Sequence, residues 1–90
     1  MDYVTIVRTI IEPLVDHPQA LLIREIPNEN KNRTTVVIVA DDNDTARLIG
    51  RRGMIANALR EVVAIAGKQD GVRLFLKFET FTDNDEASEV

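Results

Sequence analysis

Two glycines that flank two arginines, Gly50-Arg51-Arg52-Gly53, form the segment of this sequence with the clearest capacity for chemistry. Glycine lacks the Cβ that holds a backbone away from a ligand, and it tolerates positive φ. A helix that begins directly after such a turn directs unpaired N–H groups and a partial positive charge toward the same point. Arginine adds planar donors that suit phosphate oxygens. The segment therefore predicts a phosphate-binding loop, although the same residues also suit a helix end, a helix start and two solvated arginines.

Basic charge is concentrated around this loop. The chain has a formal net charge of −4 at pH 7, yet residues 47–77 carry seven basic side chains and only two acidic ones. A net-acidic protein repels nucleic acid. Salt, however, screens charges beyond roughly 8 Å at physiological ionic strength, so the local balance governs the approach of a ligand. The basic block is compatible with an anionic partner and equally with a solvated face.

Length and composition exclude several classes of protein. Ninety residues allow one small domain, which we place at residues 1–81, followed by an acidic tail at 82–90 that we expect to be disordered. The absence of cysteine excludes a disulfide-stabilised module and a thiolate zinc site, and it favours a reducing compartment. The longest apolar run is five residues, Val36–Ala40, so we expect a cytoplasmic protein without a membrane span or a signal peptide.

The elements that must position the loop can be predicted from hydrophobic spacing. Apolar residues at intervals of three and four predict a helix from Tyr3 that ends near Pro13. Residues 20–26 and 34–40 are rich in β-branched types and enclose a turn, so they predict a hairpin. A short helix over 45–49 precedes the loop.

A second helix over Met54–Ala66 follows the loop, and Gly67 is expected to end it. Its predicted core stripe is Ile55, Ala58, Leu59, Val62, Ile65 and Ala66. Strict alternation over 71–78 predicts a final strand with Val72, Leu74, Leu76 and Phe78 on one face. We therefore expect an α+β domain in which three helices cover one face of a three-stranded mixed sheet.

The loop and its flanks resemble the signature of the KH domain, a module whose Gly-x-x-Gly loop clamps four backbone nucleotides of a single strand. The order helix-strand-strand-helix-helix-strand is similar to the type II arrangement. The similarity to small stand-alone bacterial KH proteins of the KhpA type covers about residues 3–78. It rests on the segments Pro13–Pro18, Asp44–Gly50 and Ile55–Arg60.

The resemblance implies single-stranded RNA binding without catalysis or a cofactor, in the cytoplasm, with a role as an RNA chaperone or post-transcriptional regulator. It also implies pairing with a second copy or with a second KH protein of the KhpB type. An alternative remains open, in which the domain is a protein interaction module whose loop makes little contact with RNA. The net acidity of the chain favours this alternative.

Carried over by position, the resemblance assigns the sugar-phosphate backbone to Gly50, Arg51, Arg52 and Gly53. It places Ile49, Ala56 and Asn57 along the groove for the bases, with the last strand as the other rim, and Arg47 completes the predicted site. Asn57 stands where the family frequently has a basic residue.

Other polar or aromatic residues have less specific interpretations. We expect His17, the only histidine, to serve a turn, and Asp41, Asp42 and Asp44 to cap a helix rather than bind a metal ion. Phe75, between Arg73 and Lys77, suits a base or a dimer interface equally. The acidic tail suits solubility, or competition with RNA for the two arginines of the loop.

Overall fold

The computed structural model describes residues 2–30 and 32–81, and the predicted acidic tail at 82–90 lies outside them. Its helices and strands are α1 (Tyr3–Ile11), β1 (Leu22–Pro27), β2 (Arg33–Ala40), α2 (Asp42–Ile49), α3 (Met54–Gln69) and β3 (Arg73–Thr80). Short 3-10 turns occupy Glu12–Leu14, Pro18–Ala20 and Arg51–Gly53. This order confirms the predicted succession of elements, including the end of the first helix near Pro13.

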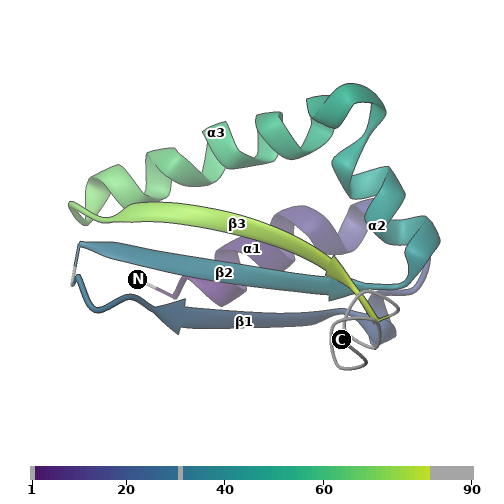
Figure 1. Ribbon diagram of the computed structural model, residues 1–90, viewed down its shortest axis with the longest axis horizontal. Helices are drawn as coiled ribbons and strands as arrows, with labels where there is room; N and C mark the ends of the chain where they lie inside the picture. Colours follow the sequence, from purple (N-terminus) through teal and green to yellow (C-terminus); the bar gives the residue numbers. More distant parts are fainter. Residues whose placement is uncertain (1, 31, 82–90) are drawn as a thin grey trace, which may run out of the picture.

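β2 is the central strand of the sheet (Figure 1). It runs antiparallel to β1, with Ile23 opposite Ile38, and parallel to β3, with Val36 opposite Leu76. Parallel neighbours need a crossover connection, which α2 and α3 supply. The predicted mixed sheet is therefore confirmed.

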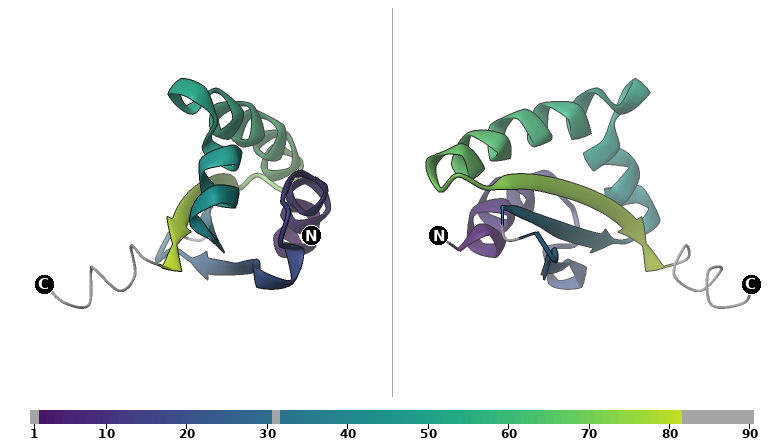
Figure 2. Two further views of the ribbon diagram at one scale, coloured as in Figure 1. Left: turned by 90° about the vertical axis from the view of Figure 1, so that its right-hand side faces the viewer. Right: turned by 60° about the vertical axis from the view of Figure 1, so that its left-hand side comes forward.

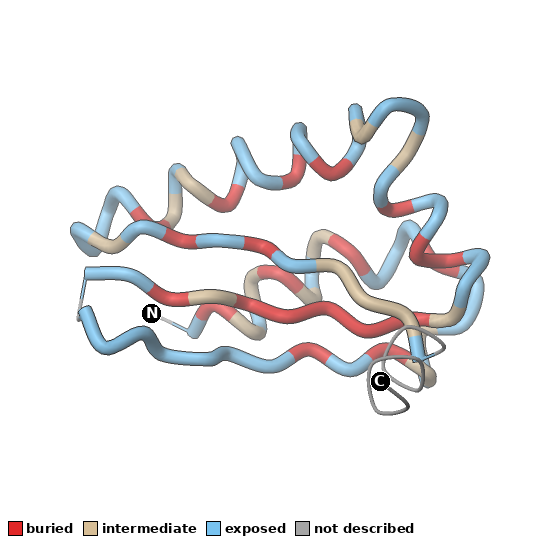
Figure 3. The backbone as a smooth tube through the Cα atoms, in the orientation of Figure 1, coloured by how far each residue is buried: buried red, intermediate tan, exposed pale blue. Residues whose placement is uncertain are grey.

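The three helices lie on the same side of the sheet (Figure 2). Between the two layers lies a core whose most deeply buried apolar side chains are Val7, Ile11, Val36, Ile38, Leu48 and Val63. β2 is buried along most of its length, as expected for a central strand (Figure 3). Full burial of each such side chain contributes about 1.5–3 kcal/mol, so this single interface supplies most of the driving force for folding.

α3 is longer than predicted, and Gly67 lies inside it. The prediction that Gly67 ends the helix is wrong. A Cβ at Gly67 would lie 2.5 Å from the carbonyl oxygen of Val72, so glycine is needed here because β3 returns against the helix. The chain reverses instead at Gly71, which has a φ of +69°.

The face of α3 that packs on the sheet also differs from the prediction. The buried residues are Ala56, Leu59, Val63 and Gly67, whereas of the predicted stripe only Leu59 is buried. The sequence of this helix has two apolar rows at helical spacing, and periodicity does not distinguish them. The row with the smaller side chains at its ends packs inward, and the other row is left partly or largely exposed.

The boundaries of three elements lie away from their predicted positions. The final strand, β3, begins at Arg73 rather than at residue 71 and ends at Thr80 rather than at residue 78. α2 begins at Asp42 rather than at residue 45, because Asp41 serves as its N-cap. β1 begins at Leu22 rather than at residue 20, because Pro18–Ala20 forms a 3-10 turn. These boundaries move by two or three residues and leave the topology unchanged.

The side of the sheet without helices is called the open sheet face below. Alternation along the strands brings to it Leu22, Arg24, Ile26, Thr35, Val37, Val39, Arg73, Phe75, Lys77 and Glu79. Within residues 2–30 and 32–81, no helix combines the length and the hydropathy needed to span a bilayer.

Candidate nucleic-acid interface

The N-terminus of α2 is fixed by hydrogen bonds from several directions. The Asp41 carboxylate accepts from the backbone N–H of Asp44 at 2.7 Å, which is the expected capping geometry. The hydroxyl of Thr45 donates to the carbonyl oxygen of Ala40 at 3.2 Å. The predicted capping role of Asp41 is confirmed, and the start of α2 is tied to the end of β2.

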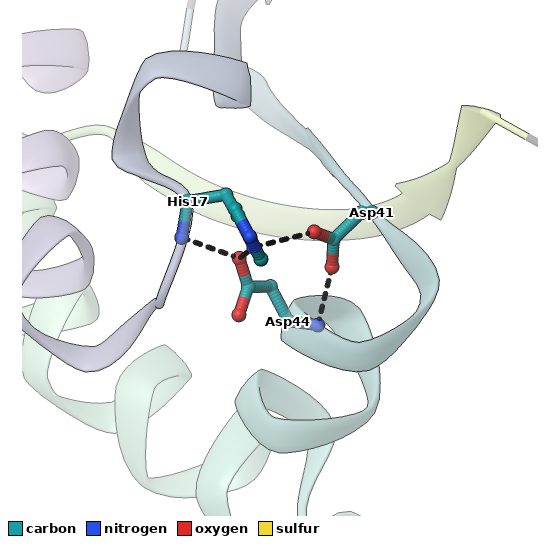
Figure 4. Close-up of side chains that lie close together, drawn as sticks. All are labelled: His17, Asp41 and Asp44. Atoms are coloured by element: carbon teal, nitrogen blue, oxygen red, sulfur yellow. Dashed lines mark hydrogen bonds and ion pairs between the residues drawn. The ribbon is translucent and has the colours of Figure 1, made fainter.

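Asp44 holds the turn before β1 against α2 (Figure 4). Its side chain is 1% exposed, and its two carboxylate oxygens accept the backbone N–H groups of Asp16 and His17, each at 3.0 Å. The N–H of Asp16 is the main reason that the pKa of Asp44 lies below its ordinary value, with the N–H of His17 acting in the same direction. Asp44 is therefore a structural carboxylate.

The imidazole of His17 lies beside both carboxylates. Its Nδ1 atom is 2.9 Å from an Asp41 oxygen and 3.6 Å from an Asp44 oxygen (Figure 4). These three groups are close enough to offer one ligand atom each to a metal ion. All three nevertheless have local structural partners, as predicted for a turn histidine and a helix cap.

Arg47, one of the predicted RNA-binding residues, is engaged elsewhere. Its guanidinium donates two hydrogen bonds to the carboxylate of Asp16, at 3.0 and 3.1 Å. The bonds to Asp16 raise the pKa of Arg47 above its ordinary value. Arg47 thus adds a second tie between α2 and the turn at 15–17, and its charge is largely compensated.

The loop at 50–53 has the backbone geometry that its glycines suggested. Gly50, Arg52 and Gly53 all have positive φ, at 75°, 57° and 75°. The chain therefore leaves α2 and enters α3 within a sharp corner. The side chains of Arg51 and Arg52 are exposed at this corner, as predicted.

The two glycines of the loop have different surroundings. A Cβ at Gly50 would lie 2.7 Å from a side-chain carbon of Ile55, so Gly50 packs against α3. A Cβ at Gly53 would meet no described atom within 4 Å. The space beside Gly53 is therefore open, and a ligand can approach the backbone there.

Two amides of the corner are already used within it. The N–H of Gly53 donates to the carbonyl oxygen of Gly50 at 3.1 Å, and the N–H of Met54 donates to the backbone carbonyl oxygen of Arg51. Gly53 is the N-cap residue of α3, and no side chain caps the first turn of this helix. The attraction for an anion therefore comes from the first turn of α3 and from the two guanidinium groups.

The remaining predicted residues divide into accessible and inaccessible ones. Ile49 is 38% exposed, and Asn57 is exposed on the first turns of α3. Ala56 is only 2% exposed, because it belongs to the packed row of the helix. Ala56 can shape the surface but offers it little area.

Arg60 and Phe78 form a pair on this side of the molecule that was not predicted from the sequence. The Arg60 guanidinium lies over the ring of Phe78 on β3, 5.5 Å from its centroid, and donates to the Asn57 amide oxygen at 3.1 Å. A cation therefore lies next to Asn57, the position that lacks the basic residue. The spacing of three residues between Asn57 and Arg60 is the sequence signal that was available, whereas the contact with Phe78 depends on the tertiary structure.

The fold and this corner define a class of protein. A type II KH domain has this element order, this mixed sheet and a Gly-x-x-Gly turn between the two helices of the crossover. The family model described as "KhpA/KhpB, KH domain" matches residues 4–78. The chain belongs to this family.

Curated relatives support the assignment. The chain is 36% identical over 72 residues to the RNA-binding protein KhpA of Bacillus subtilis, a match that covers 80% of this chain and 84% of the relative. It is 32% identical over 72 residues to the RNA-binding protein KhpA of Listeria monocytogenes, which covers 80% of this chain and 92% of the relative. No solved structure gives a significant match. The resemblance predicted from the sequence is confirmed.

Proposed function

We propose that this protein binds single-stranded RNA and that residues 50–53 clamp its sugar-phosphate backbone. The observation that carries the proposal is the corner itself, where two exposed arginines precede Gly53 and the space at the Cβ position of Gly53 is open. The curated relatives named RNA-binding protein KhpA make RNA the anion of choice. Within this proposal the chain works in the cytoplasm as an RNA chaperone or post-transcriptional regulator, without a catalytic step.

The corner would hold phosphates through two kinds of donor. The first turn of α3 presents backbone N–H groups and the positive end of its dipole. Arg51 and Arg52 present guanidinium groups, which form paired hydrogen bonds with phosphate oxygens. Because Gly53 has no side chain, the phosphate can approach the backbone closely.

Bases would then lie along the start of α3. Ile49 offers an apolar surface and Asn57 an amide, while Arg60 adds a cation held over Phe78 at the rim formed by β3. Few charges take part, so we expect a modest affinity from one domain that falls as salt rises.

The double variant Arg51→Asp/Arg52→Asp tests the proposal. We expect it to lose at least tenfold in affinity for a mixed-sequence RNA oligonucleotide, because two attractive contacts become repulsive. We expect the Tm to change little, because both side chains are exposed and Asp tolerates positive φ at position 52 better than most residues. The matched control is Arg8→Asp/Lys68→Asp, which makes the same charge change on α1 and in the last turn of α3, away from the loop. Equal losses of RNA affinity in the two double variants would mean that the loop acts only through the overall charge of the protein, which would contradict the proposal.

A second candidate function is pairing with another copy or with a KH protein of the KhpB type. The observation that favours it is the outer row of α3, where Met54, Val62 and Ile65 are 66%, 50% and 63% exposed. Apolar side chains at helical spacing on a surface suit a partner. If Ile65→Glu lowers the mass in sedimentation equilibrium while the loop double variant still binds RNA normally, interaction is the main function.

A further inference from the structure

The open sheet face has a mixed chemistry that the proposed function leaves unused. A hollow of about 550 Å³ lies on it, lined by Leu22, Arg24, Ile26, Val37, Lys77 and Glu79 among others. The three helices lie on the opposite side of the sheet (Figure 2). The face is therefore accessible, and its side chains determine what can bind to it.

The strand register arranges these side chains in rows across the sheet. Arg24 and Lys77 both lie opposite Val37, so two cations flank one apolar residue. Val37 is 7% exposed on a face without helices, so its neighbours cover it, as the long stems of arginine and lysine commonly do. The charged ends of this row remain exposed above an apolar floor.

The next row carries an aromatic ring. Ile26 and Phe75 both lie opposite Thr35, and they are 52% and 44% exposed. Along β3 the ring lies between Arg73 and Lys77, two residues away on either side and on the same face. An exposed ring flanked by cations is the arrangement that binds a base by stacking and the neighbouring phosphates by charge.

The charge of this face separates possible occupants. The face carries three positive charges, on Arg24, Arg73 and Lys77, and one negative charge, on Glu79. The Glu79 carboxylate is 3.2 Å from the Lys77 amine. Among the residues that the structure describes, Arg24 and Arg73 have no carboxylate within ion-pair distance. A second copy of the chain docked about a two-fold axis would place this excess positive charge against itself. A polyanion is complementary to it.

We propose that the open sheet face is a second contact surface for single-stranded RNA, with Phe75 as a stacking platform and Arg24, Arg73 and Lys77 as phosphate contacts. This inference rests on the proposed function. β3 is one of the two edge strands, and it connects the two surfaces because it carries Phe78 toward Arg60 on one side and Phe75 on the other. RNA held at the loop reaches the open sheet face by passing around this edge.

Oligonucleotide length tests the proposal. We would measure binding by fluorescence anisotropy for a uridine oligomer of about four nucleotides, the number clamped by a KH loop, and for one of about twelve. Phe75→Ala should weaken the longer oligomer about tenfold and leave the shorter one unchanged. Phe75→Leu, which keeps an apolar side chain, should show the same loss if the ring is what binds.

A second experiment tests the charges on this face. Lys77→Glu should weaken the longer oligomer and reduce the slope of log affinity against log salt by at least about 0.7, the contribution of one phosphate contact to a single strand. The matched control is Arg8→Glu on α1, which makes the same change in net charge and should alter neither oligomer's binding selectively.

The outcomes separate this proposal from the function on which it rests. Unchanged affinity of the longer oligomer in Phe75→Ala and Lys77→Glu would overturn the second surface, while a loss of both oligomers in Arg51→Asp/Arg52→Asp would still support the loop. Losses in the Phe75 and Lys77 variants with no effect of the loop variant would support the face and overturn the loop. If Phe75→Ala instead lowers the mass in sedimentation equilibrium and leaves RNA affinity intact, the face is a protein interface and the proposal is wrong.

Discussion

The two ends of α2 are built in opposite ways. At its N-terminus, Asp41, Asp44 and Thr45 bind backbone groups of three different segments. At its C-terminus, Gly50 donates to Ala46 and the chain turns into a corner with exposed arginines. One helix of eight residues thus separates a firmly held end from an accessible one. Stability and ligand contact can reside at opposite ends of a single short element.

The largest effect on the accessible end should come from Gly50→Ala. The new Cβ would collide with Ile55 in a backbone conformation that only glycine adopts easily, with φ 75° and ψ 175°. We expect a loss of about 3 kcal/mol in the free energy of unfolding. Gly53→Ala is the matched control and should cost only about 1 kcal/mol, because its Cβ would enter open space. Urea denaturation measures both, and equal losses would contradict the difference between the two glycines.

At the held end, Asp44→Ala should lower the Tm by several degrees. Two backbone N–H groups would lose their acceptor in a site that is nearly sealed from solvent. Asn43→Ala, on the exposed side of the same helix, should change the Tm little. RNA affinity per folded molecule should remain that of the parent. A large loss of affinity without loss of Tm would mean that the two ends are coupled.

Acid should produce a milder form of the same effect. The pKa of Asp44 is lower in the folded protein than its ordinary value, so the unfolded chain binds the proton more readily. The stability from this group is present above about pH 4, where the unfolded carboxyl is ionised, and is lost as pH falls through the folded pKa. Thermal unfolding followed across this range should show a shallower decline in Asp44→Asn than in the parent.

The smallest effect should come from Arg47→Gln. Its pair with Asp16 is half-exposed, and such pairs contribute little to stability. Because the guanidinium is already bonded to Asp16, we expect RNA affinity to change less than twofold. An anisotropy titration measures this. A loss of affinity as large as that of Arg51→Asp/Arg52→Asp would mean that Arg47 does contact RNA.

Local signals in the sequence predicted most of the fold. Proline and glycine positions gave the end of α1 and the corner at 50–53, and alternation gave the face of β3 that carries Leu74 and Leu76. Periodicity failed in α3, where two apolar rows compete and the sheet selects the one with Ala56 and Leu59. The role of Gly67 was predicted wrongly for a related reason. In the sequence, a glycine that allows close approach of another backbone segment cannot be distinguished from one that ends a helix.

The candidate site shows the same limit. Exposure of Arg51 and Arg52 followed from their position in a turn. The pairing of Arg47 with Asp16, and the placement of Arg60 over Phe78, join residues that lie 31 and 18 positions apart in the chain. Such contacts depend on how the elements pack, so the sequence alone gave no means to separate a paired arginine from an accessible one.

The close contact at Gly67 has a mechanical consequence. The backbone of α3 meets the backbone of Val72, the residue before β3, without an intervening side chain, and the N–H of Val72 donates to the carbonyl oxygen of Gly67 at 2.8 Å. α3 starts at the arginine corner and spans sixteen residues to the turn before β3. A larger side chain at position 67 would therefore push the start of β3 away from the end of the helix.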